Sequence, residues 1–271
     1  MQSLPRSVYK MYSRRGPSCP LVDREIQNLD DYLRVLESLE SSRKPHERCW
    51  FRGHSDHRWK LVPSALRYGR VQKRNTALAL YREFRRHAED KMEPVSSHSK
   101  LDDFEWMQRA QHYGLPTRLL DWTESEAVAL YFACLRTDVD GLVCVINPST
   151  LNRQAVPLQP RPLDPEQDED ILGEYMKLSG ATNRGGLGTV AVIPAWNNPR
   201  IRAQHGTFTL HGSRKLSLDT RDSPSLLYVP IRRKYKCRLL ADLNRMNWNE
   251  MSLFPEPDKI CRHLRQVAKL D

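Results

Sequence analysis

The segment Gln111–Thr123, together with the apolar stretch Glu126–Leu135 that follows it, constrains this chain more than any other part of its sequence. The segment places His, Tyr, Thr, Arg, Asp and Trp side chains around a Gly-Leu-Pro turn. Ionisable groups beside apolar bulk are typical of places where a small ligand is bound. A buried turn whose polar groups satisfy one another has the same composition. The sequence therefore predicts one of these two structures, followed by a buried helix.

Composition and length indicate a globular protein. The chain has 271 residues, of which 39% are hydrophobic and 28% are charged. We expect one large domain at 23–271, preceded by a basic flexible arm at 1–22. The sequence has no apolar run of about 20 residues that could span a bilayer, and residues 1–20 lack the apolar centre of a signal peptide. We therefore expect a cytoplasmic protein without a membrane partner.

Several familiar chemistries are absent from the sequence. The six cysteines form no CxxC pair and no Cys/His cluster, which favours reduced thiols and no metal cofactor. There is no P-loop, no GxGxxG after a strand, no GxSxG and no HExxH.

Charge is distributed unevenly along the chain. The net charge is +10, and residues 43–90 carry 13 Lys and Arg against 5 Asp and Glu, whereas residues 164–174 carry six acids and no base. A basic patch attracts nucleic-acid phosphates without specifying sequence. Ordinary solvated helix faces would produce the same pattern, so charge alone leaves both interpretations open.

Hydrophobic periodicity predicts an α+β fold, with a central β region between N- and C-terminal helices. The expected helices are 29–41, 76–90, 103–113, 126–135, a short one near 171–178, 235–246 and a last helix at 258–267 that Asp258 caps. The expected strands are 48–53, 59–62, 141–147, 189–194, 207–210 and 226–231. The segment 117–123 is expected to be a loop.

Two blocks flank that loop and carry further candidate site residues. Arg52 follows two aromatic residues in a strand, where burial is costly unless the guanidinium faces an anion. Gly53 would let a ligand approach the main chain. A structural Arg–carboxylate pair is the alternative. Later in the chain, Gln204 stands just before Gly206 and a strand, so it either points its amide into a cleft or takes part in a turn.

Within the central segment, several side chains could bind a ligand. Asp121 could orient Arg118 or His112, or it could accept a hydrogen bond from a hydroxyl group. Thr117 and Thr123 supply small donor–acceptor groups. The rings of Trp122 and Tyr131 could each stack on a flat ligand.

The chain resembles the FRG family, which is named for a Phe-Arg-Gly motif. The residues that carry the resemblance are Trp50–Gly53, Leu61–Arg67, Glu83-Phe84, Ala110–Thr123, Ala129–Ala133, Arg200–Phe208 and Leu253–Pro255. The run Gln111–Thr123 is long enough to be highly specific, whereas the other blocks alone would be weak. The resemblance extends over about residues 45–268 and implies a site built from Arg52, the 117–123 loop and Gln204.

The order of these blocks also looks like that of ADP-ribosyltransferases. The resemblance implies a β region of that fold and NAD as a substrate, with Arg52 holding its phosphate or ribose, Thr123 orienting the nicotinamide ribose and Tyr131 stacking on the nicotinamide. The NAD-binding residues implied are Arg52, Gly53, Thr117, Arg118, Thr123, Tyr131 and Phe208.

One departure from the transferase pattern concerns the acid. Where that pattern has a catalytic Glu, this chain has Gln204, and an amide only orients groups by hydrogen bonds. Either another acid, Asp121 or Glu174, stabilises the oxocarbenium-like state, or the analogy fails. The catalytic residues implied are Arg52, Asp121 and Gln204.

Two hypotheses follow. The first is an NAD-dependent ADP-ribosyltransferase toxin that modifies a nucleic acid, with RNA favoured, in a toxin–antitoxin or phage-defence setting and with an antitoxin or regulatory protein as partner. The second is a non-catalytic module that binds a nucleotide or nucleic acid in the same pocket.

Overall fold

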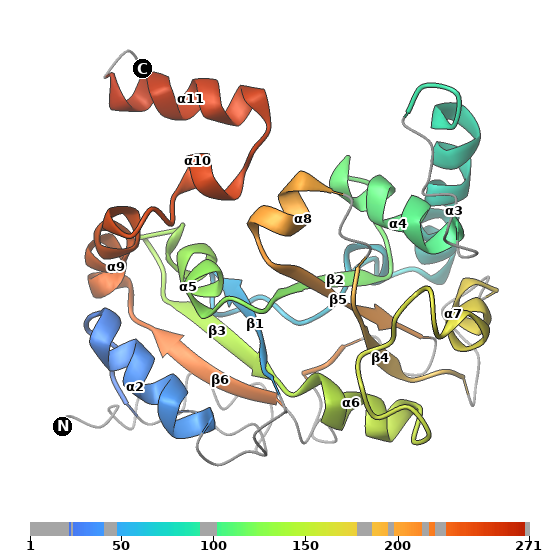
Figure 1. Ribbon diagram of the computed structural model, residues 1–271, viewed down its shortest axis with the longest axis horizontal. Coiled ribbons are helices and arrows are strands. Elements are labelled where there is room, and N and C mark those ends of the chain that lie inside the picture. The colour runs from blue at the N-terminus through green and yellow to red at the C-terminus, as the bar shows by residue number, and fades with distance from the viewer. Residues whose placement is uncertain are drawn as a thin grey trace.

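The structure is a computed structural model that describes residues 22, 24–40, 48–92, 102–177, 186–194, 198–212, 217–219 and 226–268. The fold is α+β, as the periodicity predicts (Figure 1). Of the predicted arm at 1–22, all but Val22 lies outside the described residues. The main-chain N–H of Val22 donates to the carbonyl of Tyr228 at 3.0 Å.

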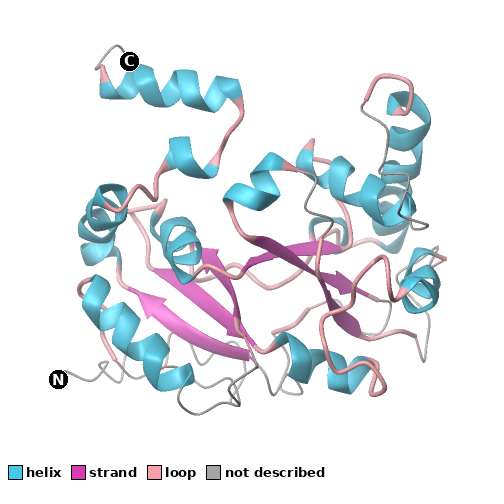
Figure 2. Ribbon diagram, viewed as in Figure 1, coloured by secondary structure: helices cyan, strands magenta, loops and turns pink. Residues whose placement is uncertain are grey.

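The strands within the described residues, magenta in Figure 2, form one antiparallel sheet. Their order across the sheet is β4-β5-β2-β1-β3-β6. Their bounds are β1 Trp50–His54, β2 Leu119–Thr123, β3 Gly141–Ile146, β4 Thr189–Val192, β5 Gly206–His211 and β6 Leu226–Ile231. β1 pairs with β3 along its whole length, but with β2 only at Phe51 and Thr123. The sheet is therefore split between β1 and β2.

Helices surround this sheet. Their bounds are α2 Leu29–Glu40, η2 Ser64–Leu66, α3 Val71–Ala88, α4 Asp102–His112, α5 Glu126–Cys134, α6 Pro148–Ala155, α7 Glu169–Met176, α8 Pro199–Ala203, α9 Arg233–Arg245, α10 Glu250–Leu253 and α11 Pro257–Val267. In the described part of the chain, none of them combines the length and apolarity that a bilayer-spanning helix needs.

The helices on one face of the sheet fall into two groups. At the β6 end, α2, α5 and α9 pack on side chains such as Phe51 and Val145. At the β4 end, α3, α4 and α7 pack on Leu119 and Leu210. The opposite face buries Trp122 and its neighbours in a separate cluster. Strand residues near the split lie between the two helix groups.

Helix α5 packs unusually close to β1. Ser125 caps its first turn by accepting a hydrogen bond from the Val128 main-chain N–H at 3.4 Å. A β-carbon on Gly53 would lie 2.0 Å from the Ala129 carbonyl oxygen and 2.6 Å from the Ala133 nitrogen. The missing side chain of Gly53 makes room for the helix, and the predicted approach of a ligand to its main chain stays a prediction.

Some predicted elements were wrong. Residues 119–123 form a central strand rather than a loop. Residues 59–62 form no strand, because the N–H of Trp59 and that of Val62 bond to carbonyls two or three residues earlier, as in turns. Asp258 lies inside the first turn of α11, so it does not cap that helix.

Other predicted elements needed smaller changes. Helix α3 begins five residues before the predicted start at 76, and α7 begins two residues before the predicted start at 171. Helices α6 and α8 were not predicted. Each begins with an Asn side chain that caps the helix, followed by Pro at its first position.

Candidate functional site

A cleft of about 280 Å³ lies on the face of the sheet where the two helix groups separate. Its floor comes from β1, β2 and β5, and its walls come from α4, α5 and α8. The described residues that line it are Phe51, Arg52, Gly53, Gln108, Gln111, His112, Asp121, Trp122, Thr123, Val128, Phe132, Asn198, Arg200, Ile201, Gln204, Gly206, Thr207 and Phe208. Apolar walls with a few polar groups are typical of small-molecule sites.

Arg52 lies at the split in the sheet. Its Nη1 donates to the main-chain carbonyl of Asp121 at 2.5 Å, and its Nε donates to His54 Nε2 at 3.2 Å. The Arg52 side chain is 19% exposed, and Nη1 lies 3.5 Å from Asp121 Oδ2. A partly accessible guanidinium held at two points presents its remaining N–H groups to an anion.

Asp121 supplies the carboxylate of the cleft, the single acid among the described lining residues. Its side chain is 60% exposed, and Oδ1 accepts a hydrogen bond from Gln111 Nε2 at 2.6 Å. Gln111 in turn accepts one from the Thr117 hydroxyl. The carboxylate is therefore oriented by α4 and remains open to a ligand.

Gln204 and Thr123 join two walls of the cleft. The Thr123 hydroxyl donates to the main-chain carbonyl of Gln204 at 2.7 Å and accepts from the Ser125 N–H at 3.0 Å. The Gln204 side-chain Nε2 donates to the Leu253 carbonyl at 3.0 Å. Both groups thus have structural partners, and the Gln204 amide links the cleft to α10.

Three residues predicted to bind NAD do not line the cleft. Thr117 and Arg118 are buried beside Tyr81 and Tyr175, under α3 and α7. Tyr131 is buried in the cluster beneath α5, where burial, followed by the effect of Glu250, raises its pKa to about 12. Phe132, the next residue along the helix, lines the cleft instead. The geometry thus places these three residues outside the cleft, and NAD binding by them stays an untested prediction.

Glu174, the second candidate acid, lies on α7 and pairs with Lys177 at 2.7 Å. It does not line the cleft. Arg52, Gly53, Asp121, Thr123, Gln204 and Phe208 do, and their proposed chemical roles remain predictions.

The structure adds lining residues that were not among the predicted catalytic or NAD-binding residues. Gln108, Gln111 and His112 have the three- and four-residue spacing of one helix face, and this periodicity could have indicated them. Arg200 packs over the Phe254 ring at 4.8 Å and lies 3.6 Å from Glu256. No local pattern distinguished it.

Electrostatics in the cleft favour a neutral His112 and an anionic ligand. Burial, followed by the charge of Arg200, lowers the pKa of His112, whereas Glu256 acts in the opposite direction. Two arginines and one carboxylate line the described part of the cleft. No group of three or more His, Cys, Asp or Glu among the described residues could hold a metal ion.

Among the comparisons with known proteins, one family model matches part of the chain. No curated protein and no solved structure matches it. The blocks at 200–208 and 253–255 lie beyond the matched region, so their resemblance to the family stays a prediction. Residues 47–140, which include β1, β2, α4 and α5 and so much of the cleft, match the family model of the FRG domain.

Proposed function

We propose that the cleft binds NAD and that the protein transfers ADP-ribose from it to a nucleic acid. The observation that carries the proposal is the joint placement of Arg52 and Asp121, a cation and an open carboxylate in contact on the floor of one cleft. A guanidinium binds phosphate in a bidentate manner, and the carboxylate suits a developing positive charge on the ribose.

The dimensions of the cleft support binding of one half of a dinucleotide. Ligand pockets are typically about 300–1,000 Å³, and this one is about 280 Å³. Phe51, Phe132 and Phe208 supply flat apolar surface for a ring. Arg200 stands at the α8 wall as a second phosphate partner.

In the proposed reaction, the bond between nicotinamide and C1 of its ribose breaks, and nicotinamide leaves with the bonding electrons. The Asp121 carboxylate stabilises the oxocarbenium-like carbon by its charge. A nucleophilic oxygen or nitrogen of the nucleic acid then bonds to C1 and loses its proton to solvent. Gln204 has no carboxylate to contribute, and its amide is bound to Leu253. We therefore assign the charge to Asp121.

Asp121→Asn tests this assignment, with Arg52→Ala as the matched variant. NAD binding is measured by calorimetry and nicotinamide release by chromatography. Because the amide keeps an acceptor for Gln111, D121N should bind NAD nearly as wild type does but release nicotinamide at least 100-fold more slowly. R52A should lose binding. Nicotinamide release by D121N at the wild-type rate would contradict the proposal.

A second function is favoured by one observation: Gln204, which the transferase analogy places where a glutamate is expected, lines the cleft with an amide. In this alternative, the protein is a regulatory module that binds a nucleotide or nucleic acid without chemistry. NAD binding without nicotinamide release, at any nucleic-acid concentration, would support it.

The transferase proposal includes a biological role as a toxin in a toxin–antitoxin or phage-defence system. Uncontrolled modification of RNA would harm the host, so a neutralising protein partner is part of the proposal. Toxicity on expression, abolished by D121N in a protein that still folds, is the expected result. Equal toxicity of D121N and wild type would remove this role.

A further inference from the structure

The segment from His57 to Arg74 connects β1 to the first turn of α3, and all of its Lys, Arg, Asp and Glu positions are Lys or Arg. It contains six Lys and Arg and no Asp or Glu. Arg58 is paired with Asp56 at 2.6 Å. Among the described residues, no carboxylate forms an ion pair with Lys60, Arg67, Arg70 or Lys73. Charges without local compensation attract polyanions.

Exposed aromatic side chains lie within this basic segment. Trp59 is 49% exposed and stands between Arg58 and Lys60, while Tyr68 is 42% exposed and follows Arg67. Rings of this kind stack on nucleobases, whose flat faces are exposed when the bases are not stacked in a duplex.

This segment reaches the cleft through two contacts. The ring of Trp59 packs against that of His54, with 6.1 Å between ring centres. The Nε2 atom of His54 accepts the Nε–H of Arg52 at 3.2 Å. Burial, followed by the Arg52 charge, lowers the pKa of Arg67, while Asp121 acts in the opposite direction. Arg67 therefore lies within electrostatic reach of the cation and the carboxylate of the cleft.

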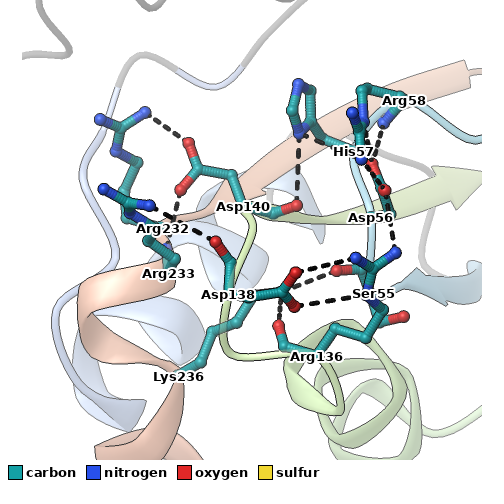
Figure 3. A network of polar contacts seen from close by, with 10 residues as sticks. All are labelled: Ser55, Asp56, His57, Arg58, Arg136, Asp138, Asp140, Arg232, Arg233 and Lys236. Carbon is teal, nitrogen blue, oxygen red and sulfur yellow. Dashed lines mark hydrogen bonds and ion pairs between the residues drawn. The ribbon is translucent and has the colours of Figure 1, made fainter.

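Polar contacts hold the beginning and the middle of the segment in place. Figure 3 shows Asp56 between Arg58 and Arg136, at 2.6 and 3.1 Å. The main-chain N–H of His57 donates to the Asp140 carbonyl at 2.9 Å. Further along, the N–H of Ala65 donates to the Thr117 carbonyl at 3.1 Å. The main chain that carries Trp59 thus has a defined position relative to β1.

We propose that residues 57–74 bind a single-stranded nucleic acid, with its backbone on Lys60, Arg67 and Lys73 and its bases on Trp59 and Tyr68, and direct it to the cleft. In this proposal the segment is the binding surface for the acceptor of ADP-ribose, so the inference rests on the proposed function. Single strands are favoured over duplexes because the exposed rings require unstacked bases.

The test measures binding of the full chain to fluorescent oligonucleotides by anisotropy, without NAD. Single-stranded RNA or DNA should bind more tightly than the matched duplex. Trp59→Ala and Tyr68→Ala should each weaken single-strand binding roughly fivefold or more. The double variant R67A/K73A should also reduce the slope of log K against log salt by about 1.4, since each phosphate contact on a single strand contributes about 0.7.

The control is R238A/R245A on α9, where both side chains are exposed and the helix lies at the β6 end of the sheet. It removes equal charge and should leave binding unchanged. Equal weakening by this control, or equal affinity for duplex with no effect of W59A and Y68A, would overturn the proposal. So would polyglutamate binding as tightly as the oligonucleotide, because the surface would then fit an acidic protein. Circular dichroism of each variant checks folding.

The two proposals fail separately. Oligonucleotide binding is measured without NAD, so an absence of nicotinamide release leaves that measurement intact. Conversely, nicotinamide release to water without oligonucleotide binding would retain the NAD chemistry and remove the nucleic-acid surface.

Discussion

Arg52 reaches across the split between β1 and β2 and donates from Nη1 to the main-chain carbonyl of Asp121. This bond connects the strands beyond Phe51 and Thr123, where their ladder ends. The guanidinium therefore does two things at once, since it joins two strands and remains partly accessible in the cleft. Because the bond is to the main chain, the position of Arg52 does not depend on the Asp121 carboxylate alone.

Gly53→Ala should destabilise the fold. The added β-carbon would fall 2.0 Å from the Ala129 carbonyl oxygen, so α5 would have to move from β1. Overpacking of this kind costs about 1–3 kcal/mol or more. The free energy of unfolding in urea measures the loss. Gly173→Ala is the control. The added β-carbon would meet no atom within 4 Å, and the residue lies inside helix α7, whose backbone conformation alanine adopts readily. A wild-type midpoint for G53A would contradict the close packing.

Phe132→Ala should weaken nucleotide binding on the order of tenfold, because it removes an aromatic wall of the cleft. Tyr131→Phe should leave affinity unchanged, since Tyr131 lies in the core beneath α5. Calorimetry with NAD or ADP-ribose compares the two. A larger loss of affinity in Y131F than in F132A would place the ligand on a different face of the helix.

Stability should fall as pH decreases from 7 to 5, in part because of His211. Burial, followed by the charges of Arg118 and Arg52, lowers its pKa from 6.5 to about 3. Below pH 6.5, His211 is therefore protonated in the unfolded chain but stays neutral in the folded chain. Acid thus favours unfolding. The contribution between pH 7 and 5 is about 2 kcal/mol.

His211→Gln is the matched variant for this pH dependence. It removes the titrating ring, so its stability loss between pH 7 and 5 should be smaller than that of wild type. Urea unfolding at both pH values provides the measurement. An unchanged difference between the two pH values in H211Q would mean that other groups cause the acid sensitivity.

Lys236→Met should destabilise the protein by about 1–3 kcal/mol. The lysine is fully buried, and its Nζ donates to the Ser55 and Arg136 carbonyls at 2.9 and 2.7 Å (Figure 3). Methionine fills similar space but leaves both carbonyls without this donor. Lys234→Met, at an exposed position two residues earlier, should change stability little. Equal effects of the two substitutions would contradict this account.

Much of the cleft could be predicted from sequence because its residues have unusual local contexts. Arg52 after two aromatics, Asp121 in a specific motif, and Gln204 before a glycine and a strand all line the cleft. The helix at 29–40 and the strands at 141–146 and 226–231 also agreed closely with prediction. Helical periodicity and apolar strand runs are properties of neighbouring residues, so a sequence reveals them directly.

Other features were decided only by tertiary structure. β2 is a strand because it pairs with β5, more than 80 residues later in the chain, and no local pattern encodes such a partner. Helix α5 is apolar on nearly every side, so periodicity did not distinguish Phe132, which faces the cleft, from Tyr131, which faces the core. The sequence by itself thus determined which side chains were available, and long-range packing decided which of them face the cleft.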